Sequence, residues 1–166
     1  LDEHMQYSSA IFDKPIESLS QAQTNKLTRL CEKLELSDKD HLLEVGSGWG
    51  GLAIFAAKNY GCRVTTTTIS DEQFNFAKAE IRAEGLEDRI ELLNKDYRLL
   101  EGQYDKIVSV EMIEAVGRKF LPGFFEKLNS LGISMLFYHG ESSSIEKVIM
   151  LSSSSLTTTV CLIILF

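Results

Sequence analysis

Cysteine and proline are scarce in this chain of 166 residues, with three and two copies respectively. The cysteines, Cys31, Cys62 and Cys161, are odd in number and irregularly spaced, so they do not indicate a disulfide framework. Free cysteines suit a reducing compartment, and we expect a cytoplasmic protein. The chain begins at Leu1 with neither an initiator methionine nor a secretory signal, from which we expect a trimmed start.

Positive charge is also in short supply. Seventeen Lys and Arg residues against 24 Asp and Glu residues give a formal net charge of −7. Phosphate binding depends on clustered basic residues, and no basic stripe is present, so nucleic acid is excluded as a main partner. Any contact with an anionic membrane has to come from local basic or apolar surface.

The hydrophobic pattern predicts one α/β domain. The apolar content of 44% is enough for a single core. The expected elements, in order, are a helix over 20–36, a strand over 41–45, a helix from 50 to 61, a strand over 62–68, a helix over 71–84, strands over 90–93 and 104–110, and a helix over 119–130. Gly61 is expected to end the second helix as a left-handed cap, and residues 70–73 (SDEQ) are expected to form a capping box at the start of the third. This alternation indicates a mostly parallel sheet that binds ligands beyond the carboxyl ends of its strands, at the loops near Gly46, Thr68, Asp96 and Glu111.

The central motif is the glycine-rich stretch that follows the first expected strand. Gly46, Gly48 and Gly51 fit the spacing of dinucleotide-binding turns, in which a ligand rests on a helix N-terminus. The dinucleotide interpretation also needs an acid at the end of the second strand, where this chain has threonines and reaches Asp71 only later. Glu44, two residues before the first glycine, instead fits the acid-x-Gly-x-Gly opening that S-adenosylmethionine enzymes place near the cofactor's amino group. A sharp turn that binds nothing is the third alternative.

The C-terminal part differs in character from the rest. Serine and threonine runs follow residue 134, and residues 148–166 carry no charge over 19 positions, which reaches the lower range of a membrane span. Seven of these residues are Ser or Thr, so a truncated or read-through end is the preferred interpretation over a span. We therefore divide the chain into an N-terminal arm over 1–18, an α/β domain over 19–138 and an aberrant tail over 139–166.

Several stretches taken together resemble the cyclopropane-fatty-acyl-phospholipid synthase family, S-adenosylmethionine-dependent enzymes that methylenate lipid double bonds. The resemblance covers about residues 1–133, and its stretches are 5–10 (MQYSSA), 44–51 (EVGSGWGG), 68–73 (TISDEQ), 95–98 (KDYR) and 104–117 (YDKIVSVEMIEAVG). It implies a Rossmann-like class I methyltransferase fold with C-terminal strands and lid incomplete. It also implies S-adenosylmethionine as cofactor and unsaturated phospholipid acyl chains at a membrane surface as substrate, with the protein peripheral to that membrane.

The resemblance also implies roles for individual residues. Those expected at the cofactor are Tyr7 and Ser8 of the arm, Glu44, Gly46 and Gly48 of the turn, Thr68, Ser70 and Gln73 at the ribose and methionine, and Asp96 with Tyr97 at the adenine. Glu114 matches the glutamate of the family's bicarbonate site, and Ser9 stands where many members have cysteine, so these two are the catalytic candidates. No metal ligands are predicted.

The implied chemistry is methyl transfer to a cis double bond, followed by loss of a proton from the new methyl group to a base, for which the family uses bicarbonate. The chain departs from the family pattern at Glu111, at Ala115 and at the position of Phe137, where a histidine is expected. Cofactor binding is therefore the firmer expectation, and this form could be inactive. The alternatives are a small-molecule N- or O-methyltransferase, a non-catalytic cofactor-binding remnant and, last, a dehydrogenase.

Overall fold

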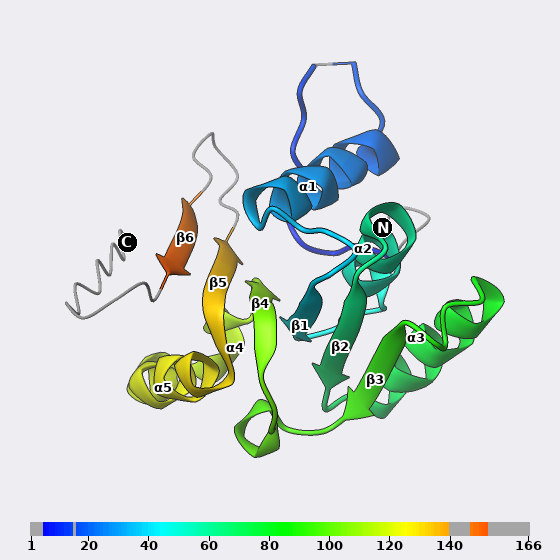
Figure 1. Cartoon of the computed structure of the whole chain (residues 1–166). Coiled ribbons are helices and arrows are strands. Elements are labelled where there is room, and N and C mark those ends of the chain that lie inside the picture. Colours follow the sequence, from blue (N-terminus) through cyan, green and yellow to red (C-terminus); the bar gives the residue numbers. More distant parts are fainter. Residues whose placement is uncertain (1–4, 15, 140–146, 153–166) are drawn as a thin grey trace.

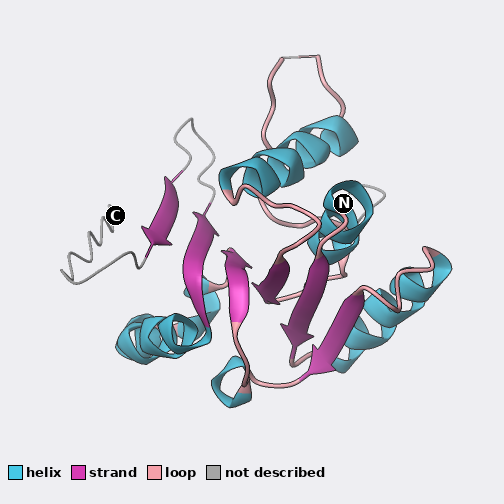
Figure 2. Ribbon diagram, viewed as in Figure 1, coloured by secondary structure: helices cyan, strands magenta, loops and turns pink. Residues whose placement is uncertain are grey.

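The computed structural model describes residues 5–14, 16–139 and 147–152. Its centre is a six-stranded sheet in the order β3-β2-β1-β4-β5-β6, with helices on both faces (Figures 1 and 2). The strands are β1 (His41–Val45), β2 (Arg63–Thr68), β3 (Ile90–Asn94), β4 (Tyr104–Val110), β5 (Gly132–His139) and β6 (Lys147–Ser152). The first five strands run parallel, and β6 pairs antiparallel with β5. The predicted mostly parallel α/β sheet is confirmed.

One longer helix precedes the sheet and three more connect its strands, and they begin and end close to where the sequence predicts. These are α1 (Leu19–Lys33), α2 (Gly51–Tyr60), α3 (Asp71–Ala83) and α5 (Leu121–Leu131). Ser18 caps α1 by accepting from the Gln21 amide at 3.2 Å, and left-handed Gly61 ends α2 with a φ of 70°. The short helix α4 (Ile113–Val116) and the 3₁₀ turns η1 (Tyr97–Leu99) and η2 (Arg118–Phe120) were not predicted, because segments this short carry no periodic pattern.

The sheet is buried on both faces by two apolar clusters. Leu42 of β1 belongs to the cluster formed with α1, α2 and α3, whereas its neighbour Leu43 belongs to the cluster formed with Phe124 and Leu128 of α5. Successive side chains of a strand point to opposite faces, so a run of apolar residues such as β1 serves both clusters. This packing fixes the carboxyl ends of β1, β2, β3 and β4 at one edge of the sheet.

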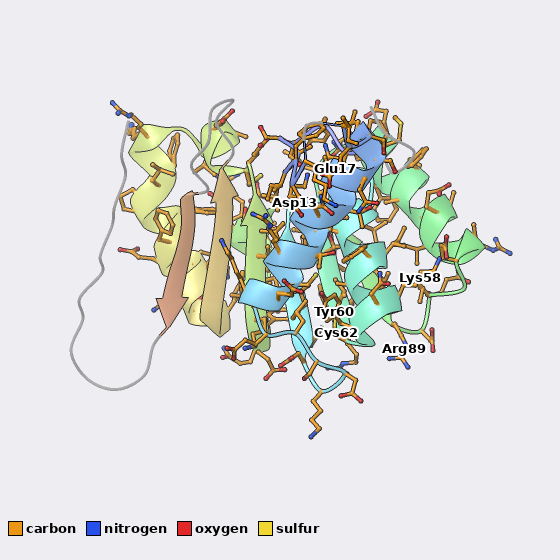
Figure 3. All side chains as sticks on the ribbon, turned by 90° about the horizontal axis from the view of Figure 1, so that it is seen from above. Asp13, Glu17, Lys58, Tyr60, Cys62 and Arg89 are labelled. Atoms are coloured by element: carbon orange, nitrogen blue, oxygen red, sulfur yellow. The ribbon has the colours of Figure 1, made fainter. Side chains whose placement is uncertain are left out.

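The N-terminal arm lies along α1 and has no helix or strand of its own in its described residues. The Ile11 amide donates to the Ala22 carbonyl at 3.1 Å, and Gln23 Nε2 donates to the Ser8 carbonyl at 2.9 Å. Asp13 forms an ion pair with Arg29. Figure 3 shows Asp13 beside α1, with Tyr60, Cys62 and Arg89 toward the opposite end of the sheet.

The C-terminal region contains two strands that are not among the expected elements, β5 and the edge strand β6, and β6 falls in the expected tail. The remainder of that tail, residues 140–146 and 153–166, lies outside the described residues, as does most of the uncharged stretch considered as a span. Among the described residues, no helix has the length and apolar character that a membrane crossing requires. Cys161 also falls outside the description, while Cys31 and Cys62 are buried free thiols.

Replacing Gly50 by alanine tests how tightly the turn before α2 is built. Gly50 has a φ of +94°, and an added Cβ would lie 3.0 Å from the Ala77 Cβ of α3. We expect Gly50→Ala to lower the free energy of unfolding by about 2 to 3 kcal/mol, because left-handed strain and a close contact add. Urea unfolding measures the change.

Gly85→Ala is the matched control, since Gly85 has a φ of +66° with nothing within 4 Å of an added Cβ. It should cost only about 1 kcal/mol of unfolding free energy from backbone strain. Equal losses in the two variants would contradict the close packing of α2 on α3.

Candidate active site

The turn between β1 and α2 holds its shape through glycine backbone conformations that other residues rarely adopt. Gly46, Gly48 and Gly50 have φ values of +97°, +51° and +94°. The amides of Gly46 and Ser47 both donate to the Thr67 carbonyl of β2, at 3.1 and 2.8 Å. These bonds tie the turn to the neighbouring strand and leave bare backbone along the carboxyl edge of the sheet.

Two side chains lie close to the positions that a Cβ would take on Gly46 and Gly48. A Cβ on Gly48 would lie 3.5 Å from the Tyr7 ring, and one on Gly46 would lie 3.5 Å from Met112 Sδ. The arm and the segment after β4 therefore face the turn from two directions. The third glycine of the predicted spacing, Gly51, is the first residue of α2. In dinucleotide-binding turns the third glycine allows close packing, but here Gly50 is the glycine that packs closely against α3, at Ala77.

A cavity of about 510 Å³ opens over the turn. Of the residues predicted at the cofactor, eight line it: Tyr7, Gly46, Gly48, Thr68, Ser70, Gln73, Asp96 and Tyr97. They come from the arm, from the β1–α2 turn, from the β2–α3 connection and from the loop after β3. The fold thus brings together, at one edge of the sheet, residues that are up to 90 positions apart in the sequence.

The other two predicted cofactor residues line a second, smaller cavity of about 30 Å³. Ser8 and Glu44 belong to this cavity, which also includes Lys26 of α1. It shares Tyr7, Gly46 and Gly48 with the larger one. We refer to them as the large cavity and the small cavity; they meet at the glycine turn.

The wall after β2 is held by a set of hydrogen bonds that corrects one sequence expectation. Ser70 Oγ accepts from the Gln73 amide at 3.3 Å, as an N-cap should. The Gln73 side chain was expected to reach back to the Ser70 amide in a capping box, but that amide donates to Thr68 Oγ1 at 3.1 Å. Gln73 Oε1 accepts instead from the Thr68 hydroxyl at 2.9 Å, which fixes both side chains at the cavity wall.

The loop after β3 presents a carboxylate beside an aromatic ring. Asp96 accepts two hydrogen bonds at 2.9 Å on Oδ1, from the Arg98 amide and Nε, and pairs with Arg98 Nη2 at 2.6 Å. The hydrogen bond from the Arg98 side chain holds the pKa of Asp96 below its usual value, so this acid stays ionised. The Tyr97 ring packs edge-on against Phe124, with centroids 5.0 Å apart.

Glu44 is a carboxyl group buried inside the protein. It is 3% exposed and accepts from the Thr66 hydroxyl at 2.6 Å. Burial raises the pKa of Glu44 to about 8, and the hydrogen bond from Thr66 only partly opposes that shift. A group that holds its proton near neutrality can lose it when a cation arrives, which suits an amine-binding position.

The two catalytic candidates lie beside the cavities and do not line them. The Ser9 amide donates to Glu111 Oε1 at 2.9 Å, and Glu111 has a φ of +51°, so the arm is tied to the end of β4. Glu114 is an exposed residue of α4, next to Ala115, which does line the large cavity. Their catalytic roles stay predictions.

Several residues of the site were missed by sequence reasoning. Apolar side chains that line the large cavity include Ile69, Met112, Val116 and Phe120, and no motif distinguishes them from core residues. Lys26 could have been found, because it lies four residues after Ala22 and four before Leu30 on the buried face of α1. A lysine on an apolar stripe is the signal that was available.

The pKa of Glu44 leads to a prediction about stability. The unfolded carboxyl loses its proton near pH 4.5, and the folded one near pH 8, so the free energy of unfolding falls as pH rises through that window. From pH 5 to pH 7.5 the free energy of unfolding of the unsubstituted protein should fall by about 3 kcal/mol more than that of the Glu44→Gln variant, which has no carboxyl group at this position. Urea unfolding at both pH values measures the difference.

Glu91→Gln is the matched control, because Glu91 is an exposed carboxylate that also accepts from a threonine of β2, Thr65, at 3.1 Å. This variant should follow the pH dependence of the unsubstituted protein. If Glu44→Gln did the same, the buried and protonated state of Glu44 would be contradicted.

Comparison with known proteins agrees with this arrangement. The chain is 47% identical over 130 residues to a probable fatty acid methyltransferase of Pseudomonas putida, and the matched region covers 77% of this chain and 33% of that protein. It is 46% identical over 125 residues to the cyclopropane-fatty-acyl-phospholipid synthase of Escherichia coli K12, over 75% of this chain and 31% of the relative. The chain thus spans about a third of the length of these relatives.

Solved structures share the fold. The mycolic acid cyclopropane synthase CmaA1, solved with SAH and CTAB, has a TM-score of 0.78 and 28% identity over 83% of this chain and 50% of that one. Coclaurine N-methyltransferase, bound to N-methylheliamine and SAH, has a TM-score of 0.76 and 25% identity over 83% and 42% of the two chains. The sheet is therefore the Rossmann-like sheet of class I S-adenosylmethionine-dependent methyltransferases.

The family assignment rests on most of the chain. The model of the mycolic acid cyclopropane synthetase family matches residues 1–146, which include the arm, both cavities and all of β5. The predicted resemblance to cyclopropane synthases is confirmed. This chain belongs to the mycolic acid cyclopropane synthetase family of S-adenosylmethionine-dependent methyltransferases.

Proposed function

We propose that this chain forms the cofactor-binding part of an enzyme that transfers the methyl carbon of S-adenosylmethionine to a cis double bond of an unsaturated phospholipid acyl chain. The observation that carries the proposal is that the large cavity is lined both by the glycine turn and by exposed apolar side chains. The names of the relatives, a fatty acid methyltransferase and a cyclopropane-fatty-acyl-phospholipid synthase, support a lipid acceptor.

The residues present fit the cofactor. Its amino-acid part would lie where the small cavity meets the large one at the glycine turn, with the buried carboxyl of Glu44 available for the ammonium group. Its nucleoside would lie in the large cavity, with Thr68, Gln73 and Asp96 as polar partners and Tyr97 as an aromatic one. Gly46 and Gly48 carry no Cβ, so the backbone there allows close approach of a ligand. When bound, the cofactor supplies an electrophilic methyl group on a sulfonium.

The apolar wall is suited to an acyl chain. Ile69 and Phe120 line the large cavity although they are 75% and 61% exposed, and Tyr7 is 63% exposed. Exposed apolar side chains that gather at one opening favour an apolar ligand. Contact with a membrane surface follows from the substrate, so the proposal includes a peripheral position on a phospholipid bilayer.

The chemistry assigns different tasks to the two sides of the cavity. An isolated double bond is a weak nucleophile, so the rate depends on holding the alkene carbon and the methyl carbon close and aligned. The new C–C bond forms as the S–C bond breaks, and the resulting carbocation must be shielded from water. A base then takes a proton from the added methyl group as the ring closes. We propose Glu114, with bicarbonate, for this step on the resemblance alone.

The test is transfer of labelled methyl carbon. A full-length version of the protein that contains this chain is incubated with [methyl-¹⁴C]S-adenosylmethionine and vesicles of a cis-monounsaturated phosphatidylethanolamine, and the acyl chains are separated after hydrolysis. We expect label in cyclopropane or methyl-branched chains, and none when the vesicles carry only saturated chains. Flotation should recover the protein with the vesicles.

Two outcomes would overturn the proposal. Label on nitrogen or oxygen of a small acceptor would favour the N- or O-methyltransferase alternative, which the likeness to coclaurine N-methyltransferase motivates. Saturable binding of the cofactor without transfer to any acceptor would favour a non-catalytic cofactor-binding protein.

A further inference from the structure

Lys26 is a charged residue that the fold buries completely. It lies in the middle of α1 and is 0% exposed, on the same helix face as the core residues Leu27 and Leu30. Burying an ammonium group is costly unless the group is paired or used. An apolar side chain of similar volume would fill this space without that cost, so the position calls for an explanation.

The ammonium group is directed at the arm. Lys26 Nζ donates to Gln6 Oε1 at 3.1 Å and also to Ser8 Oγ, and both residues line the small cavity together with Lys26. Gln23, one turn before Lys26, holds the Ser8 carbonyl at 2.9 Å. Two residues of α1 thus fix the arm residue that follows Tyr7, whose ring lies over Gly48.

The small cavity therefore contains one basic and one acidic side chain, both buried. Lys26 comes from α1, and Glu44 comes from β1. An α-amino acid carries the complementary pair of groups, a carboxylate and an ammonium. Between side chains that are this deeply buried, charge complementarity contributes far more than it does on an exposed surface.

We propose that Lys26 is the specificity-determining residue for the carboxylate of the cofactor. Its charge, together with the polar groups of Gln6 and Ser8 that it positions, makes the small cavity selective for ligands that carry a carboxylate. The proposal rests on the proposed function, since it assumes that the cofactor's amino-acid part lies at the mouth of this cavity with its charged groups directed into it. It adds a residue and a ligand group to that function. The competing explanation is that Lys26 only attaches the arm to α1.

The two explanations differ in what happens when the ligand loses its carboxylate. S-Adenosylhomocysteine and its decarboxylated form share the nucleoside, the sulfur and the ammonium group. Isothermal titration calorimetry with both ligands gives the ratio of their dissociation constants. We expect the unsubstituted protein to bind the carboxylate-bearing ligand about tenfold or more tightly, as for hydrogen bonds to charged groups.

Lys26→Gln is the decisive variant, because a glutamine amide retains N–H donors for Gln6 and Ser8 but carries no charge. In this variant we expect the dissociation constants of the two ligands to differ by no more than about twofold, with the affinity for the decarboxylated ligand retained. The matched control is Lys58→Gln, which changes a lysine of α2 that is 57% exposed and paired with Glu84 at 2.6 Å. This control should keep the full ratio.

The outcomes separate the inference from the function on which it rests. A Lys26→Gln protein that weakens both ligands by the same factor, or keeps the full ratio, shows that Lys26 only attaches the arm and overturns the proposal. A ratio near one in the unsubstituted protein overturns it even if Lys26→Gln fails to fold. Failure of the unsubstituted protein to bind S-adenosylhomocysteine at all contradicts the proposed function itself.

Discussion

The site depends on the left-handed backbone of the turn between β1 and α2. Three glycines with positive φ let the chain reverse direction within a few residues of Val45, and the Thr67 carbonyl fixes the turn by accepting from the Gly46 and Ser47 amides. A residue with a side chain at Gly46 or Gly48 would be strained, and its Cβ would lie 3.5 Å from Met112 or Tyr7. The two cavities meet at this turn, so its position decides where the arm, the β2–α3 connection and the loop after β3 can meet a ligand.

Local chemistry made much of this site predictable from sequence. The glycine spacing, the serine cap at Ser70 and the glycine stop at Gly61 each rest on interactions within a few residues, which a sequence displays directly. Parallel strands place their carboxyl ends at one edge, and this rule brought Thr68 and Asp96 together with the turn. The family likeness added the arm, which no local pattern would have assigned to the cavity.

The rest depended on contacts distant in sequence. The apolar side chains that line the large cavity are of the same types as those of the core. Gln73 does not complete the expected capping box, because its side chain accepts from the Thr68 hydroxyl instead. The strand β6 lies between two serine runs, where no strand pattern stands out. Lys26 was passed over although its helical spacing placed it on a buried face. Ser8 and Gln6, which accept hydrogen bonds from Lys26, are arm residues 18 and 20 positions away. Only the folded chain shows that Lys26 lines the same cavity as Glu44.

The central claim is that the carboxyl edge of the sheet around the glycine turn binds S-adenosylmethionine, and amide chemical shifts test it most directly. In ¹⁵N-labelled protein titrated with S-adenosylhomocysteine, we predict saturable shifts at Gly46, Gly48, Thr68 and Asp96. Amides at the opposite edge, such as that of Arg63, should stay in place. Saturable shifts at the opposite edge with none at the turn, or no shifts at all, would contradict the account.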